Sequence, residues 1–202
     1  MISALVIAAG ESKRMGQTKQ LLPWQGKVLL QHVLDNILGS EVDEVILVLG
    51  CEAERILEKV DTPKVKVVLN PDYRKGMITS IQRGLNALQK EVEAFFIVLG
   101  DQPGISSPIY NRLIREFRRV YPSKKILLPT YQGKRGHPAL FSVDYRAEGS
   151  ALKGDVGFRQ IILDHPSDLL LIEMGARGVL EDIDTPEDYE NLLKGKSPGE
   201  PT

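Results

Sequence analysis

The stretch LVIAAGESKRMGQTK, residues 5–19, decides the expected fold, because an apolar run ends there in small residues and two cations follow. Residues 5–8 are typical of a buried strand. Ala9 and Gly10 carry little or no side chain, so backbone N–H groups at this turn can approach an anion closely. Arg14 and Lys19 add a guanidinium and an ammonium within one short loop, and both groups bind phosphate oxygens. The alternative is a glycine turn with two solvated basic residues, but the motifs farther along the chain favour a triphosphate site.

The composition argues against several classes of partner. At 202 residues, with 42% hydrophobic and 26% charged residues, the chain has the make-up of an ordinary globular protein of one or two domains. Its net charge of −1 gives no overall positive field for nucleic acid or an anionic membrane, so local cations must bind any anion. No apolar run approaches the ~20 residues of a membrane span. The single cysteine, Cys51, cannot form an internal disulfide, and we expect a cytoplasmic protein.

Short apolar runs alternate with helical patterns along most of the chain. The runs at 4–8, 44–49, 65–69, 95–99 and 126–128 are typical of strands covered on both faces. Apolar spacing predicts helices at 29–38, 53–60, 77–88 and 108–121, the last with Ser107 as N-cap. Residues 139–142 and 169–173 resemble strands, 157–163 is weakly helical, and Thr185 is the expected N-cap of a final helix. This order predicts an α/β fold with a mostly parallel sheet, one domain over residues 1–193 and a disordered tail at 194–202.

Small, polar or acidic residues follow four of the predicted strands. Gly10, Gly50, Asn70 and Asp101 come after the first, second, third and fourth strands, and residues 76–80 open a helix whose N-terminus is positive. In an open parallel sheet, ligands bind beyond the carboxyl ends of the strands. The sequence therefore predicts one ligand site at this edge of the sheet.

Asp101 follows a buried strand directly, which would project its carboxylate into that site. Two like charges ~4 Å apart cost about 4 kcal/mol at an effective dielectric constant near 20, so a carboxylate beside a triphosphate is repelled. A bridging Mg²⁺ reverses this repulsion and prefers one or two carboxylates plus phosphate oxygens. Asp184 is the candidate for the second carboxylate. The alternatives are a turn aspartate at 101 that binds nearby backbone, and an acidic residue beside a helix start at 184.

Two glycine-rich loops follow in the second half of the chain. The first, residues 133–139, contains Arg135 and His137, and packing explains a histidine between Gly136 and Pro138 poorly. The second, residues 154–159, places an acid and a base in one turn. A structural histidine remains the alternative for His137.

Together these motifs resemble the molybdenum cofactor cytidylyltransferase family, within the larger nucleotidyltransferase superfamily that uses a Rossmann-like sheet. The N-terminal signature fits the whole superfamily, whereas Gly-Asp-Gln-Pro at 100–103 and Arg-Gly-His-Pro at 135–138 narrow the resemblance. The matching segments follow the family order through nearly the whole chain, at residues 5–19, 21–23, 70, 76–80, 100–103, 135–138, 154–159 and 182–186.

The resemblance implies a three-layer Rossmann-like nucleotidyltransferase fold and a role for each matching residue. The phosphate of a molybdopterin-type cofactor would attack the α-phosphate of a nucleoside triphosphate and release pyrophosphate. Arg14, Lys19 and Asp101 would be catalytic, and Asp101 and Asp184 would hold Mg²⁺. Nucleotide contacts would come from Ala8, Ala9, Gly10, Arg14, Lys19, Asn70, Gly76, Met77 and Ser80. Acceptor contacts would come from Arg135, His137, Asp155 and Arg159.

The nucleotide, the partners and the competing functions follow from the same resemblance. Related guanylyltransferases carry Gly-Gly where this chain has Ala9-Gly10, so CTP is favoured over GTP. A molybdenum hydroxylase or its chaperone would receive the product. The alternatives are a nucleotidyltransferase acting on a sugar or alcohol phosphate, and an accessory protein that binds nucleotide or cofactor without catalysis.

Overall fold

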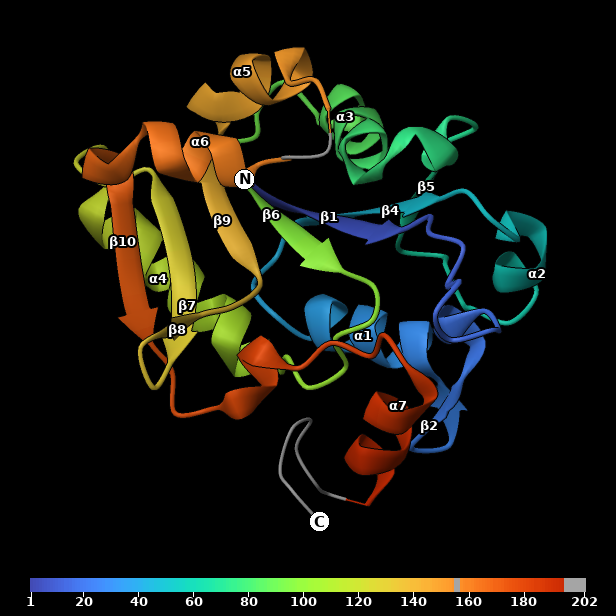
Figure 1. Cartoon of the computed structure of the whole chain (residues 1–202). Coiled ribbons are helices and arrows are strands. Elements are labelled where there is room, and N and C mark those ends of the chain that lie inside the picture. Colours follow the sequence, from blue (N-terminus) through green and yellow to red (C-terminus); the bar gives the residue numbers. More distant parts are fainter. Residues whose placement is uncertain (155–156, 195–202) are drawn as a thin grey trace.

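Helices cover both faces of a central sheet in the structure, a computed structural model that describes residues 1–154 and 157–194 (Figure 1). The strands are β1 (Ile2–Ala8), β2 (Pro23–Trp24), β3 (Lys27–Val28), β4 (Glu44–Leu49), β5 (Lys66–Leu69), β6 (Ala94–Leu99), β7 (Ile126–Tyr131), β8 (Lys134–Arg135), β9 (Ala139–Ser142) and β10 (Leu169–Glu173). The α-helices are α1 (Leu29–Leu38), α2 (Ala53–Leu57), α3 (Met77–Ala87), α4 (Ser107–Val120), α5 (Arg146–Ala151), α6 (Arg159–Asp164) and α7 (Pro186–Leu193). Short 3-10 helices are η1 (Lys19–Leu21), η2 (Tyr73–Lys75), η3 (Val143–Tyr145), η4 (Pro166–Asp168) and η5 (Arg177–Leu180). No helix in these ranges is long and apolar enough to cross a membrane.

The central sheet has the strand order β10-β7-β9-β6-β1-β4-β5. Parallel pairs join β1 to β4 and β6, β4 to β5, and β7 to β10. β9 runs antiparallel to both β6 and β7, and β8 pairs with β7 as a hairpin. The sheet is therefore mostly parallel, as predicted. β9 confirms the strand predicted at 139–142, but its antiparallel direction between β6 and β7 was not predicted.

The apolar strand residues divide between two cores because side chains alternate across a strand. In β1, Ala4 and Val6 pack with residues of α1 and α4, whereas Leu5 packs with residues of α3. Figure 1 shows α3, α5 and α6 on one side of the sheet, and α1 and α4 on the other. Burial on both faces explains why β1, β4 and β6 are apolar along almost their whole length.

The reversal of strand order positions the ligand site. The chain runs outward from β1 to β4 and β5, then returns to β6 on the other side of β1. The carboxyl ends of β1 and β6 therefore lie side by side at the reversal, the usual ligand position in such sheets. Gly100 permits this close approach, because a Cβ there would lie 2.9 Å from the Cβ of Ala8.

Some element boundaries differ from the prediction. The N-cap of α4 is Ser106 instead of Ser107, whose hydroxyl donates a hydrogen bond to the carbonyl of Asn36 at 2.6 Å. β7 extends three residues beyond the predicted run because Thr130 and Tyr131 pair with β8. α2 ends at Leu57, and α6 begins at Arg159 instead of residue 157. The short elements β2, β3, β8 and α5 were not predicted, and residues 195–202 of the predicted tail lie outside the described ranges.

Candidate active site

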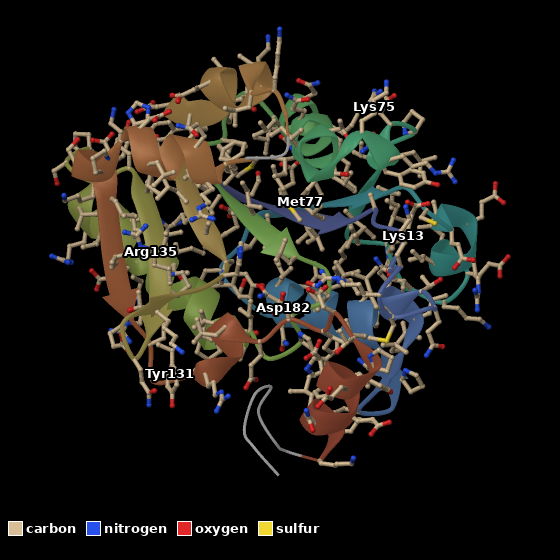
Figure 2. The ribbon with its side chains drawn as sticks, viewed as in Figure 1. Lys13, Lys75, Met77, Tyr131, Arg135 and Asp182 are labelled. Atoms are coloured by element: carbon tan, nitrogen blue, oxygen red, sulfur yellow. The ribbon has the colours of Figure 1, made fainter. Side chains whose placement is uncertain are left out.

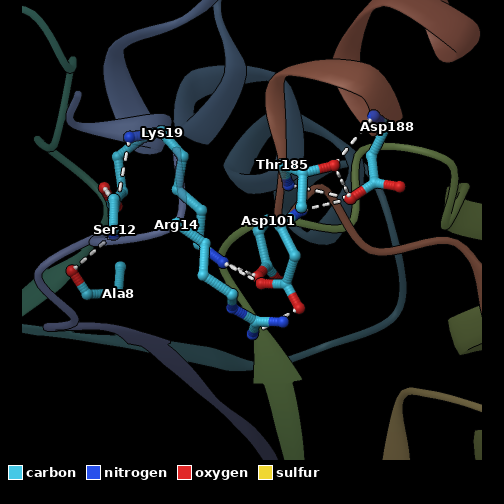
Figure 3. A network of polar contacts seen from close by, with 9 residues as sticks. Ala8, Ser12, Arg14, Lys19, Asp101, Thr185 and Asp188 are labelled. Atoms are coloured by element: carbon cyan, nitrogen blue, oxygen red, sulfur yellow. Dashed lines mark hydrogen bonds and ion pairs between the residues drawn. The ribbon is translucent and has the colours of Figure 1, made fainter. Parts of the chain in front are cut away.

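The loop after β1 presents a run of free backbone donors. Within the described part of the chain, the N–H groups of residues 10–14 donate no hydrogen bond. Ser12 adopts a positive φ of 52°, and the carbonyl of Ser12 accepts from the N–H of Met15 at 3.0 Å, which turns the loop back. The Ser12 hydroxyl accepts from the N–H of Lys19 at 3.2 Å (Figure 3). Consecutive free N–H groups in such a turn form a concave anion site.

Lys19 joins this loop to two carboxylates from distant parts of the chain (Figure 3). Its Nζ forms ion pairs with Oδ2 of Asp101 and with Oδ1 of Asp184, the latter at 3.0 Å. Arg14 Nη2 binds the other oxygen of Asp184 at 2.7 Å. Burial alone would lower the pKa of Lys19, but the contacts with Asp101 and Asp184 outweigh it and raise that pKa. Lys19 is therefore an ammonium held between two carboxylates.

Asp184 is positioned by the start of α7. Thr185, the N-cap, accepts from the N–H of Asp188 at 3.2 Å, and the Asp188 carboxylate accepts from the N–H of Thr185 at 2.8 Å. Asp188 also accepts from the N–H of Asp184 at 3.2 Å. This capping box confirms the predicted helix start and fixes the backbone that carries Asp184.

Two adjacent cavities share a wall. The Lys19 cavity, of about 300 Å³, is lined by Ile7, Ala8, Ala9, Gly10, Arg14, Lys19, Gln20, Tyr73, Met77, Ser80, Leu99, Gly100, Asp101, Asp182 and Asp184. The His137 cavity, of about 540 Å³, is lined by Met77, Ile81, Ile97, Leu99, Leu128, Arg135, Gly136, His137, Ala139, Phe141, Gly157, Phe158, Arg159, Ile162 and Leu163. Met77 and Leu99 line both, and Figure 2 shows Met77 near the middle of the molecule.

Most of the predicted site residues line one of these cavities. The predicted nucleotide, metal and catalytic residues meet in the Lys19 cavity, except for two: Asn70 and Gly76 line neither cavity. Asn70 is 1% exposed, and its amide donates to the hydroxyls of Thr79 and Ser80, both at 2.9 Å. Gly76 is the N-cap of α3, with a φ of 110°. These two residues shape the start of α3, and a direct nucleotide contact from either stays a prediction.

The predicted acceptor residues Arg135, His137 and Arg159 line the His137 cavity, whereas Asp155 lies outside the described residues. His137 donates its backbone N–H to the carbonyl of Val179 at 2.8 Å. A Cβ at Gly136 would lie only 2.2 Å from that carbonyl oxygen, so the loop requires glycine there. Burial lowers the pKa of His137, while Asp101 and Asp182 oppose this shift from the side of the Lys19 cavity.

Sequence reasoning assigned no role to six residues that line the Lys19 cavity, namely Ile7, Gln20, Tyr73, Leu99, Gly100 and Asp182. Ile7 and Gly100 are direct neighbours of predicted site residues in the motifs at 5–19 and 100–103. Asp182, an exposed residue two positions before Asp184, has a carboxyl pKa raised by partial desolvation and then by Asp184 and Asp101. The Asp-Ile-Asp spacing could have indicated it, because residues i and i+2 of an extended segment share a face. Gln20, Tyr73 and Leu99 carry no comparable signal. They reach the cavity through the packing of the 3-10 helices and β6.

The chemistry of the two carboxylates fits a divalent cation. Asp101 and Asp184 already coordinate a cationic group, and Asp101 Oδ1 is buried without a hydrogen-bond partner among the described residues. Within those residues, no three His, Cys, Asp or Glu side chains form a group that could hold a metal by themselves. Mg²⁺ is commonly bound by one or two carboxylates, with substrate phosphates and waters completing its shell. The pair therefore fits a cation that arrives with a nucleotide.

Residues 4–169 match the model of the MobA-like NTP transferase domain. The chain belongs to this family. It is a nucleotidyltransferase, and the Rossmann-like α/β fold agrees with that of its structural neighbours.

Curated relatives cover almost the whole chain. The molybdenum cofactor cytidylyltransferase of Escherichia coli (strain K12) is 31% identical over 193 residues, or 93% of each chain. The nicotine blue oxidoreductase of Paenarthrobacter nicotinovorans is 30% identical over 197 residues, or 95% of this chain and 96% of the relative. A probable molybdenum cofactor guanylyltransferase of Methanosarcina acetivorans is 27% identical over 209 residues, which cover 95% of this chain and 89% of the relative.

Solved structures share the same fold. A protein from Mycobacterium sp. strain JC1, homologous to a Mycobacterium tuberculosis protein, superposes with a TM-score of 0.85 at 31% identity, covering 96% of both chains. The M. tuberculosis protein in complex with manganese has a TM-score of 0.78 at 29% identity, covering 96% of this chain and 98% of that one.

Proposed function

We propose that this enzyme transfers CMP from CTP to the phosphate of a molybdopterin-type cofactor and releases pyrophosphate. The observation that carries the proposal is the pair of cavities that meet at Met77 and Leu99. One cavity offers cations, free N–H groups and two carboxylates to a triphosphate. The other offers apolar walls with Arg135, His137 and Arg159 to a ring-bearing phosphate. The similarity to the E. coli cytidylyltransferase supports this pairing.

The reaction needs two anions held in line more than it needs covalent help from the protein. An acceptor phosphate oxygen forms a bond to the α-phosphorus while the bond from that phosphorus to the bridging oxygen of pyrophosphate breaks. The N–H groups of residues 10–14, with Arg14 and Lys19, would bind the triphosphate oxygens and stabilise the charge on the leaving pyrophosphate. Arg135 or Arg159, which line the His137 cavity, would hold the acceptor phosphate.

Asp101 and Asp184 would hold Mg²⁺ on the triphosphate side. When bound, the cation would neutralise phosphate oxygens and remove their repulsion from the two carboxylates. Lys19 would then exchange its contacts with the carboxylates for contacts with phosphate oxygens, which keeps an ammonium within reach of the charge that develops. Thr185 and Asp188 would keep Asp184 in register with Asp101 during this exchange.

Selectivity for CTP over GTP would come from Ala9, a lining residue of the Lys19 cavity that carries a methyl group where glycine would carry none. One methyl group in a pocket is usually worth roughly ten- to two-hundredfold in kcat/KM. The relative with a guanylyltransferase name makes GTP the alternative nucleotide. A molybdenum hydroxylase or its chaperone would be the recipient of the product.

Pyrophosphate release tests this function directly. The purified protein is assayed with CTP or GTP and Mg²⁺, with and without molybdopterin. We expect release that depends on molybdopterin, with kcat/KM for CTP at least about tenfold above that for GTP. Ala9→Gly should narrow this ratio of kcat/KM values, whereas Lys13→Met, an exposed side chain in the same loop that lines neither cavity, should leave the ratio unchanged. Equal kcat/KM values would contradict the choice of CTP, and no acceptor-dependent release would contradict the transfer itself.

A further inference from the structure

One aromatic side chain forms the inner wall of the His137 cavity. Phe158, in the turn before α6, is 5% exposed yet lines the cavity. Its ring meets Phe141 edge-on, with centroids 4.9 Å apart, and meets Phe95 edge-on at 5.9 Å. These two rings block its movement toward the sheet, so the open side of Phe158 is the cavity.

The ring of Phe158 packs against the backbone of α5 at Gly149, where no side chain intervenes. A Cβ at Gly149, on α5, would lie 2.2 Å from Cζ and 2.7 Å from Cε2 of Phe158, and 3.1 Å from Cδ1 of Leu85. Such distances are incompatible with the present position of the ring. Since the core around Phe158 is filled, a side chain at 149 must drive the ring toward the cavity.

We propose that the Phe158–Gly149 pair sets the depth of the His137 cavity and thereby determines which acceptors the enzyme admits. Phe158, Phe141 and Ile81 line the His137 cavity, and these apolar side chains suit the face of a flat ring system. Arg135 and Arg159 are exposed at the same cavity and suit an anionic group on that ring. The pair therefore selects planar, ring-bearing anions by size. That the natural ligand is a molybdopterin rests on the proposed function.

The test uses two probes and a double-variant design. The first probe is 8-anilinonaphthalene-1-sulfonate, an aromatic ring system with an anionic group, and the second is molybdopterin. Gly149→Ala should weaken binding of both by at least about tenfold, the effect of losing one methyl-sized space in an apolar pocket. CTP–Mg²⁺ affinity, measured in parallel, should stay within about twofold, since neither Phe158 nor Gly149 lines the Lys19 cavity. Adding Phe158→Leu to Gly149→Ala removes the collision and should restore probe binding to within about threefold of the starting protein.

Phe158→Leu alone keeps Gly149 and tests the same inference should Gly149→Ala not fold. It deepens the cavity, so the larger dimeric form of the naphthalene dye should gain affinity relative to the monomeric dye by at least about threefold. An unchanged dye ratio in Phe158→Leu, or a folded Gly149→Ala variant with unchanged probe affinity, would overturn the inference. So would a starting protein that binds neither probe. A starting protein that binds the dye but not molybdopterin would contradict the proposed acceptor and leave the Phe158–Gly149 inference supported.

Discussion

Lys19 is the residue on which the two carboxylates of the site converge. Its ammonium lies between Asp101 and Asp184, where the proposed cation would bind. Two unit charges ~4 Å apart interact by about 4 kcal/mol at an effective dielectric constant near 20, so the ammonium competes strongly with a free divalent ion. The metal is therefore expected to bind together with a triphosphate, which gives Lys19 new partners.

Lys19→Met should raise the affinity of the nucleotide-free protein for Mn²⁺ by at least about tenfold, because the carboxylates lose their competing cation. The same variant should bind CTP more weakly. Electron paramagnetic resonance of free Mn²⁺ measures the first effect and calorimetry the second. Lys13→Met is the matched control, since Lys13 is 80% exposed and pairs with Glu11 outside the carboxylate pair. Unchanged or weaker Mn²⁺ binding in Lys19→Met would show that Lys19 and the metal do not share a site.

His137 links stability to pH. Burial lowers its pKa below the usual 6.5, so the folded protein favours the neutral ring more than the unfolded chain does. The contribution of neutral His137 to the free energy of unfolding is complete above about pH 6.5, the pKa in the unfolded chain. This contribution is lost as the pH falls through the lower pKa of the folded protein. The melting temperature should therefore drop between pH 7.5 and pH 5.5, and His137→Gln should make the drop smaller. His32, whose pKa burial also lowers, remains in both proteins, so part of the drop persists. An equal drop in melting temperature in the unaltered protein and in His137→Gln would exclude His137 as a source of the pH dependence.

Among the elements, α7 couples a helix cap to the site. Asp188 accepts hydrogen bonds from the N–H groups of Thr185 and Asp184, so removing its carboxylate releases the backbone of a proposed metal ligand. Asp188→Ala should cost about 1 kcal/mol of unfolding free energy and should also raise the Mg²⁺ concentration needed for half-maximal activity. Chemical denaturation and a Mg²⁺ titration measure the two effects.

The control for α7 is Glu187→Ala, which removes an exposed acidic residue from the same first turn without touching the capping box. It should change stability by only a few tenths of a kcal/mol, as expected for one charge near a helix N-terminus. Its Mg²⁺ requirement should match that of the unaltered protein. If Asp188→Ala and this control needed the same Mg²⁺ concentration, the helix cap would not contribute to metal binding at Asp184.

Helices and strands that carry an apolar pattern along their length could be predicted from the sequence. Short strands that form only by pairing with another strand could not. β4 and α1 begin and end at the predicted residues, because an apolar run or a one-face stripe marks their whole length. β8 has two residues and exists through its pairing with β7, so no periodicity could reveal it. Likewise, the hydroxyl of Ser107 binds α1, a tertiary contact that displaced it from the predicted N-cap position.

At the scale of the whole molecule, the site depends on strand order, which a single sequence does not specify. The motifs around Gly10 and Asp101 predicted that both residues belong to a ligand site, but the two residues lie side by side only because β6 returns beside β1. Tyr73 and Leu128 escaped prediction as lining residues because distant elements place them there. The shared wall at Met77 and Leu99 likewise joins α3 to β6. Sequence motifs therefore predicted many of the lining residues but not the shape of the two cavities.

Transfer of the labelled α-phosphate tests the joint use of the two cavities most directly. The protein is incubated with CTP carrying ³²P at the α-position, with Mg²⁺ and molybdopterin, and the products are separated. We expect the label in a product that contains both CMP and the pterin, formed in equal amount with pyrophosphate. Label that remains in CTP, or that appears as free CMP whether or not molybdopterin is present, would contradict transfer between the two cavities.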